Sequence, residues 1–216
     1  WAIGGNWNLS MEKFMANQRF VQDVRIRASY GEAGNVNGFA SDFGYLQTYG
    51  AGGYAGAPGT IPTSPGNPTY KLESQLITNI GADISFWNKR VRVTVDAYKK
   101  DSRNLFINQN LSRTSGFTAL ATNAAKMRNK GFEFTASVDA FKTDELLVTV
   151  GVNGAFNKNE VLDLGGLTEI PQGTGIIRVG ESLGTHYVVG YLGVDPQSGQ
   201  PVYEDLNGNP TNVYSA

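Results

Sequence analysis

The 216-residue sequence contains no cysteine, only one histidine and no long apolar run. Without cysteine, disulfide bonds, thiol nucleophiles and cysteine-ligated metals are excluded. No segment approaches the roughly 18 consecutive apolar residues of a transmembrane helix. Lysine and arginine (18) nearly balance aspartate and glutamate (19), so we expect no nucleic acid partner. These absences are still compatible with a membrane protein, because a closed barrel crosses a bilayer with alternating strands alone.

The chain is rich in glycine (27) and tyrosine (10), and its clearest pattern lies at residues 72–98. Apolar and polar residues alternate from Leu72 to Phe86 and again from Val91 to Ala97. Period-two alternation gives an extended strand one apolar face and one polar face. The short connection at residues 87–90 therefore predicts a β-hairpin. Its strands reach the roughly 9–11 residues that a tilted strand needs to cross a bilayer.

Similar alternation recurs on both sides of this hairpin. It predicts strands at residues 1–9, 24–30, 131–140 and 146–153, and the start of another at 176–179. Short connections are predicted at residues 10–22 (with a short helical turn), 87–90 and 141–145, and long ones at residues 31–70, 99–125 and 158–175. The tail at residues 193–210 has turn chemistry nearly throughout.

All the short connections fall at one end of the predicted strands and all the long ones at the other. Bacterial outer-membrane barrels show this asymmetry, with tight periplasmic turns and long external loops. The sequence therefore predicts an all-β fold, an antiparallel transmembrane β-barrel segment with long extracellular loops and short periplasmic turns. A soluble β-sandwich would give the same alternation, because its apolar face would form the core. Strand length and the sorting of the loops favour the barrel.

In a barrel of this kind, the apolar face contacts lipid and the polar face lines the lumen. Val93 and Val150 are predicted on the lipid face, and their neighbours Thr94 and Thr149 on the lumen face. The polar residues predicted to line the lumen are Glu73, Gln75, Asn79, Asp83, Arg92, Asp96, Glu133, Asp139 and Asn153.

No constellation in the sequence points to catalysis or to a metal, so we expect no enzyme, no cofactor and no catalytic residue. His186 stands alone, without the neighbouring serine or cysteine that a nucleophilic mechanism uses. The adjacent carboxylates Asp144-Glu145 and Glu204-Asp205 fall in predicted turns. Residues 205–209 begin like a calcium loop but lack its later acidic ligands, which favours an Asn-Gly turn.

The long connection at residues 31–70 offers exposed aromatic side chains. Tyrosine rings beside amide and hydroxyl groups suit sugars and peptides, which present CH faces and polar edges. The residues predicted to contact substrate in this way are Tyr45, Tyr49, Tyr54 and Tyr70. The alternative interpretation is that these tyrosines pack the loop against its neighbours.

Four segments resemble the SusC/RagA-like branch of TonB-dependent outer-membrane transporters. They are VRIRASYGEAGN (24–35), NIGADISFWNKRVRVTVDAYKKDSRNL (79–105), KMRNKGFEFTASVD (126–139) and GYLGVDPQSGQPVYEDLNGNP (190–210). The four runs occur in the order expected for that family, and together with the stretches between them they span most of the chain.

The resemblance implies a 22-stranded barrel of the cell outer membrane, to which this chain contributes about seven strands. It also implies an N-terminal plug, energy from the TonB complex and a SusD-like surface lipoprotein as a lid. Residues 1–216 would form part of one barrel domain, and we expect the plug and the C-terminal strand to lie outside this piece of a longer polypeptide. The function implied is active import of oligosaccharides or oligopeptides. The alternative from another class is a soluble carbohydrate-binding or adhesive β-sandwich.

Overall fold

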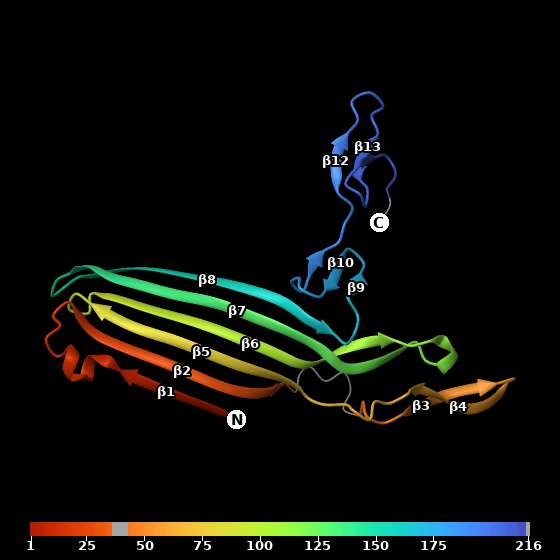
Figure 1. Cartoon of the computed structure of the whole chain (residues 1–216), viewed down its shortest axis with the longest axis horizontal. Helices are drawn as coiled ribbons and strands as arrows, with labels where there is room; N and C mark the ends of the chain where they lie inside the picture. The colour runs from red at the N-terminus through yellow and green to blue at the C-terminus, as the bar shows by residue number, and fades with distance from the viewer. Residues whose placement is uncertain (36–42, 215–216) are drawn as a thin grey trace.

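A computed structural model describes residues 1–35 and 43–214, apart from the side chain of Tyr54 (Figure 1). Its main element is one antiparallel sheet of six strands, in the order β1-β2-β5-β6-β7-β8. The strands are β1 Ala2–Asn8, β2 Val21–Asn35, β5 Glu73–Phe86, β6 Val91–Asn110, β7 Ala119–Lys142 and β8 Leu147–Leu164. Each strand in this order pairs with the next, so the sheet is a meander interrupted only by the insertion between β2 and β5.

Three smaller sheets lie at the end of the main sheet opposite its short turns (Figure 1). They are β3 Thr48–Tyr54 with β4 Ala57–Ser64; β9 Glu169–Gln172, β10 Gly175–Arg178 and β11 Thr185–His186; and β12 Tyr191–Val194, β13 Pro201–Glu204 and β14 Pro210–Thr211. The helical elements described are the 3-10 turns η1 Leu9–Met11, η2 Lys13–Met15 and η3 Arg113–Ser115. Within residues 1–35 and 43–214, no helix has the length and apolarity that a membrane span requires.

The predicted strands exist, but the structure extends most of them at the end away from the short turns. β2 continues to Asn35, where a loop was predicted from residue 31. The predicted connection 99–125 is wrong, because β6 and β7 continue as a paired ribbon and leave only residues 111–118 between them. β8 likewise runs to Leu164, into the predicted loop 158–175. The alternation ends before the strands do, because backbone pairing does not need an apolar face.

Two other segments predicted as loop or turn also contain strands. Within the predicted loop 31–70, β3 and β4 form a hairpin whose two central residues, Ala55 and Gly56, have positive φ angles of 50° and 86°. Positive φ at both positions is the geometry of the tight turns that suit the twist of paired strands. The tail at residues 193–210 forms part of the sheet β12-β13-β14 instead of turns throughout. The strand predicted to begin at 176–179 is β10, which pairs with β9 and β11 and not with the main sheet.

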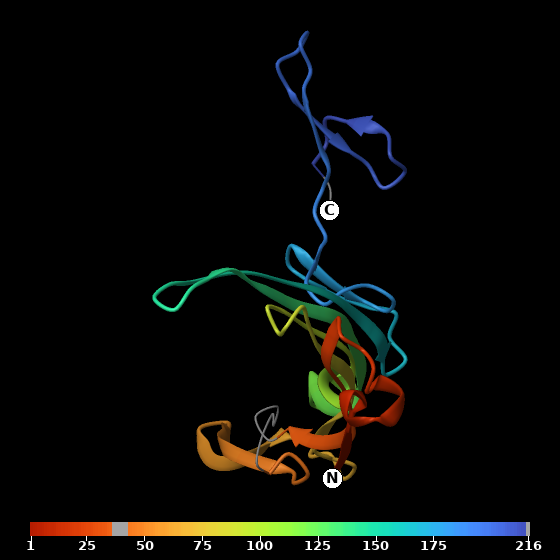
Figure 2. The ribbon, with the colours of Figure 1, turned by 90° about the vertical axis from the view of Figure 1, so that its left-hand side faces the viewer.

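Within residues 1–35 and 43–214, no second layer packs over the apolar face of the main sheet (Figures 1 and 2). On its inner strands, Ile80 and Phe132 are 57% and 46% exposed. The only cluster of buried apolar residues in the described part of the chain centres on Ala125, Val161 and Leu164, at the far end of β7 and β8. Partly buried Ile170 and Ile177 of the small β9-β10 sheet pack against that cluster, with Leu105 and Ile107 of β6. The sheet is thus a single curved wall with one local core.

Candidate functional site: the polar face of the sheet

The strand register places all nine polar residues predicted as lumen-lining on one face of the sheet. Asp83 lies opposite Thr94 of β6, and Asp96 lies opposite Glu133 of β7. Thr94 in turn lies opposite Thr135 of β7, which lies opposite Asn153 of β8, so Asn153 is in the same row as Asp83. The other members lie an even number of residues from these along the same strands, so their side chains are on the same face. They are Glu73, Gln75, Asn79, Arg92 and Asp139. The structure thus gathers side chains from four strands into one polar surface.

An ion cluster occupies the middle of this surface. The Arg27 guanidinium donates to both Asp83 oxygens, with Nε–Oδ2 at 3.0 Å, and to Asp96 Oδ2 at 3.1 Å. Thr94 Oγ1 donates to Asp83 Oδ1 at 3.1 Å. Arg27 reaches Asp96 across β5 because the residue between them is Gly81. A Cβ at Gly81 would collide with the Asp96 carboxylate and crowd the Arg27 guanidinium, so any other residue there would force these side chains to move.

A second ion pair lies near the short turns. Arg92 binds Asp139 through both terminal guanidinium nitrogens, Nη1 at 3.0 Å and Nη2 at 2.8 Å, and Nη1 also donates to the backbone carbonyl of Lys89. Thr149 Oγ1 donates to Asp139 Oδ1 at 2.9 Å. A bidentate arginine–carboxylate pair fixes the orientation of both side chains as well as their distance. This cluster therefore ties together β6, β7 and β8.

Further along the strands, Tyr98 of β6 contacts a residue of β8 across β7, as Arg27 contacts Asp96 across β5. Its hydroxyl lies 3.2 Å from Asn157 Oδ1, to which it donates, and the residue between them on β7 is Gly131. The ammonium group of Lys100 lies over the Tyr98 ring, 4.8 Å from its centroid.

Closer to the long loops, Gln75 donates to Ser102 Oγ, and both oxygens of buried Glu73 accept hydrogen bonds. The Glu73 donors are Asn35 Nδ2 at 2.8 Å and the Phe106 backbone N–H at 3.1 Å.

Two acceptors on this face have no partner among the described residues. Asn79 Oδ1 and Asp96 Oδ1 are buried and have no hydrogen-bond partner within the part of the chain that the structure describes. The side chains of Glu133 and Asn153 are exposed. Among residues 1–35 and 43–214 there is no group of three or more histidine, cysteine or carboxylate side chains that could hold a metal. The face can bind polar groups and water, and it presents both donors and acceptors.

The loop tyrosines have different surroundings. Tyr45 and Tyr49 are 53% and 62% exposed. Tyr70 is half-buried, with its ring 4.7 Å from that of Phe106 and against Gly44, so it packs the loop onto β6. Tyr54 lies in β3, and its side chain is outside the described residues.

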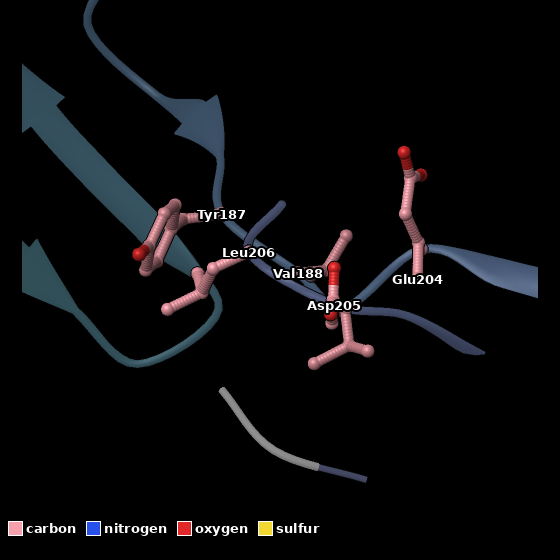
Figure 3. Close-up of a pocket in the computed structure, with 7 residues that line it drawn as sticks. Tyr187, Val188, Glu204, Asp205 and Leu206 are labelled. Carbon is pink, nitrogen blue, oxygen red and sulfur yellow. The ribbon is translucent and has the colours of Figure 1, made fainter. Parts of the chain in front are cut away.

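A small pocket lies between the linker after β11 and the turn after β13 (Figure 3). Tyr187 and Leu206 lie on one side of this pocket, whereas Glu204 points away from them (Figure 3). Its volume of about 170 Å³ is below the roughly 300–1,000 Å³ of typical ligand pockets. Asp205 accepts from the backbone N–H groups of Asn207 and Asn209, both at 2.8 Å, which is a turn as predicted.

The sequence interpretation missed Arg27, Tyr98 and Asn157 as members of the polar face. The signal was present, because Arg25 and Arg27 alternate with apolar residues in the same way as the residues that were chosen. Their cross-strand contacts could not be predicted from the sequence, since these depend on which glycine lies opposite which side chain.

The fold and this face define a segment of an antiparallel β-barrel wall, apolar on one side and polar on the other. The chain belongs to the family described as TonB dependent receptor-like, beta-barrel, which matches residues 1–214. It is 31% identical over 194 residues to TonB-dependent receptor P39 of Formosa agariphila, and 26% identical over 230 residues to TonB-dependent receptor SusC of Bacteroides thetaiotaomicron. These matches cover 89% and 95% of the chain, respectively.

Solved structures of RagAB give the same result for the fold. The whole chain superposes on the RagAB peptide importer in the "open-open" state with a TM-score of 0.89 at 24% identity. A structure of the RagAB peptide transporter gives a TM-score of 0.84 at 25% identity, again over the whole chain. The chain spans only 18% of P39, 23% of SusC and 24% of the matched "open-open" RagAB chain. The recognition of a SusC/RagA-like barrel segment is thereby confirmed.

Proposed function

We propose that residues 1–216 form part of the barrel wall of an outer-membrane importer of oligosaccharides or oligopeptides. The TonB complex supplies the energy, and a SusD-like surface lipoprotein closes the barrel from outside. The plug and the closing C-terminal strand belong to other parts of the full-length protein. Family membership and the names of the similar receptors support this role, as do the RagAB peptide importer structures.

The observation that carries the proposal is the exposure of an apolar face on inner strands. Ile80 and Phe132 have sheet neighbours on both sides and are still about half exposed. On β8, outward-facing apolar side chains run from Val148 to Phe156. At about 3.4 Å per residue this is about 27 Å of strand, or about 21 Å across the bilayer at a typical tilt of about 40°. Outer-membrane barrels carry an apolar band of roughly 25 Å, so lipid fits this face.

The polar face then lines the lumen. Its ion pairs are already satisfied within the sheet, so most of its residues hold the wall together and do not select cargo. The open acceptors Asn79 Oδ1 and Asp96 Oδ1 are suited to donors from the plug or from water. Of the loop tyrosines, exposed Tyr45 and Tyr49 are the better candidates for contact with a glycan or peptide, whereas Tyr70 packs on Phe106.

The soluble sandwich remains the second candidate, and the same exposure argues against it. A sandwich buries its apolar face under a second sheet about 10 Å away. No such layer covers β5, β6 or β7 within residues 1–35 and 43–214. An apolar surface of this extent in water is a liability for a soluble protein.

The test uses the full-length protein in its native host. Cells are fractionated, and uptake of fluorescent oligopeptides and oligosaccharides is compared in wild type, a strain lacking the receptor, a strain lacking TonB and a strain lacking the SusD-like partner. We expect the receptor in the outer membrane and uptake of one substrate class that is lost without the receptor or TonB. Recovery of the receptor in a soluble fraction, or uptake that does not depend on it, contradicts the proposal.

A further inference from the structure

Three lysines stand side by side on the apolar face of the sheet. Lys99 of β6 lies opposite Lys130 of β7, which in turn lies opposite Lys158 of β8. Lys130 and Lys158 lie two residues from Phe132 and Phe156 along their strands, so their side chains are on the same face. Phe132 and Phe156 form the adjacent row. The lysine row is therefore the first row beyond the apolar band, on the side of the long loops.

This arrangement is unfavourable by itself. Neighbouring strands are about 4.8 Å apart, and like charges directly opposite each other destabilise a sheet. Lys99 pairs with Asp101 at 3.2 Å, but Asp101 also binds Arg128 at 2.6 Å. Lys130 and Lys158 are exposed, and neither forms an ion pair with a residue that the structure describes.

The next row outward does not neutralise the lysines. It contains Asp101, Arg128 and Glu160, with Arg128 between the two carboxylates in the register. Counting these with the three lysines, the two rows on β6, β7 and β8 carry four positive and two negative side chains. A net positive patch therefore lies directly beyond the apolar band.

Aromatic side chains mark the same level as an interface. Tyr30 of β2 lies opposite Thr78 of β5, which lies opposite Lys99, so Tyr30 is in the same row as the lysines. Its ring lies 5.5 Å from that of Trp1. Tryptophan and tyrosine gather where hydrocarbon meets the headgroups, and lysine extends its ammonium group toward the headgroups from the same level. Phosphate groups of lipids occupy this zone.

We infer that Lys99, Lys130 and Lys158 form a binding site for the phosphate of an anionic lipid in the outer leaflet. The lipid's acyl chains lie along Phe132 and Phe156, and its phosphate lies between the ammonium groups of Lys130 and Lys158. The combination of charge and adjoining apolar surface fits a phospholipid or lipid A better than free phosphate, which has no use for the apolar rows. This inference rests on the lipid-facing assignment made above.

The experiment uses the full-length receptor in detergent, with wild type compared with the triple variant Lys99→Gln, Lys130→Gln, Lys158→Gln. Binding of monophosphoryl lipid A is titrated by native mass spectrometry. A competing arm adds inorganic phosphate, and a neutral arm uses lipid A from which the phosphate has been removed. The matched control is Lys100→Gln, one residue from Lys99 but on the opposite face. Uptake is measured for every variant.

Each basic residue near an anionic surface contributes about 1 kcal/mol, so we expect about 100-fold weaker binding by the triple variant. The dephosphorylated lipid is expected to bind wild type as weakly as the phosphorylated lipid binds the triple variant, and Lys100→Gln is expected to bind like wild type. Equal binding by wild type and the triple variant overturns the inference, as does an equal loss in Lys100→Gln. Displacement of the lipid by millimolar inorganic phosphate shows a free-anion site and overturns the lipid assignment. Normal outer-membrane uptake alongside any of these results leaves the proposed function intact.

Discussion

The guanidinium of Arg27 and the carboxylate of Asp96 are 3.1 Å apart although a whole strand separates β2 from β6. Gly81 makes this possible, because any Cβ at that position would occupy the space of the contact. Tyr98 and Asn157 are joined over Gly131 in the same way. The polar face is thus built from contacts that span three strands as well as from pairs of neighbours.

Replacing Gly81 with alanine is expected to weaken the barrel, because the new methyl group pushes Arg27 away from Asp96. The expected loss is about 1–2 kcal/mol in the free energy of unfolding, within the usual range for a crowded, partly buried site. The measurement is urea unfolding of the full-length receptor in detergent. The matched control is Gly151→Ala on the same face, where a Cβ meets only ordinary contacts at 3.6 Å or more. A Gly81→Ala variant as stable as this control contradicts the explanation.

Arginine on the two faces of one strand tests the orientation of the wall. Val93 lies in the middle row of the apolar band, and Thr94 faces Asp83 on the other side. Val93→Arg is expected to destabilise the inserted barrel by roughly 2–4 kcal/mol, as for a charge near the bilayer midplane. Thr94→Arg is expected to be tolerated far better, because its new charge lies on the polar face, near the carboxylate of Asp83. Val150 and Thr149 provide an independent pair on β8. Equal sensitivity of both faces in unfolding from lipid bilayers rules out the assignment.

Removing Tyr45 and Tyr49 tests the proposed substrate contacts. The double alanine variant is expected to lower substrate affinity about tenfold, since one aromatic contact contributes roughly 0.5–1.5 kcal/mol. Tyr70→Ala is expected to lower stability, because it removes the ring packed on Phe106. Binding of the transported substrate to purified receptor, followed by calorimetry, distinguishes these outcomes. Tyr191→Ala, an exposed tyrosine outside this loop, is the control, and a similar loss of affinity there argues against a specific role.

The turn after β13 is expected to loosen in acid. Hydrogen bonds from the backbone N–H groups of Asn209 and Asn207 hold the pKa of Asp205 below its ordinary value of 3.8. A lowered pKa in the folded turn means that Asp205 stabilises it above the ordinary pKa and that this contribution is lost as the pH falls through the lowered value. Pepsin cleavage at residues 202–211 of the full-length receptor, followed from about pH 5 to about pH 2, is expected to rise in this window. In Asp205→Asn the turn should be equally cleavable across the range after correction for pepsin activity, and a wild-type-like profile contradicts the account.

The sequence was informative where one face of the strands is apolar. From Val91 to Ala97 the alternation identified both the strand and its facing, because a shift of one residue would exchange the two faces. The same logic grouped Asp83, Asp96 and Asn153 on one surface before any contact was known. These features follow from the periodicity of the sequence alone.

The sequence was less informative beyond the apolar band. From Leu105 to Asn110, β6 still pairs with β7, but Leu105 and Ile107 pack on the local core while Phe106 between them packs on Tyr70, so the simple apolar/polar alternation disappears while the backbone pairing continues. The strands β12-β13-β14 were missed because their proline- and glycine-rich sequence also satisfies turn chemistry. The contact between Arg27 and Asp96 could not be predicted, since it depends on the register that places Gly81 between them.

The crossings over Gly81 and Gly131 act as braces. Arg27 of β2 is joined to Asp96 of β6 over β5, and Tyr98 of β6 to Asn157 of β8 over β7, so sliding of β2, β6 or β8 along the sheet breaks an ion pair or a hydrogen bond. In the proposed importer, these contacts would resist shear of the wall, and we expect the movements of its transport cycle to be concentrated in the long hairpins beyond the apolar band.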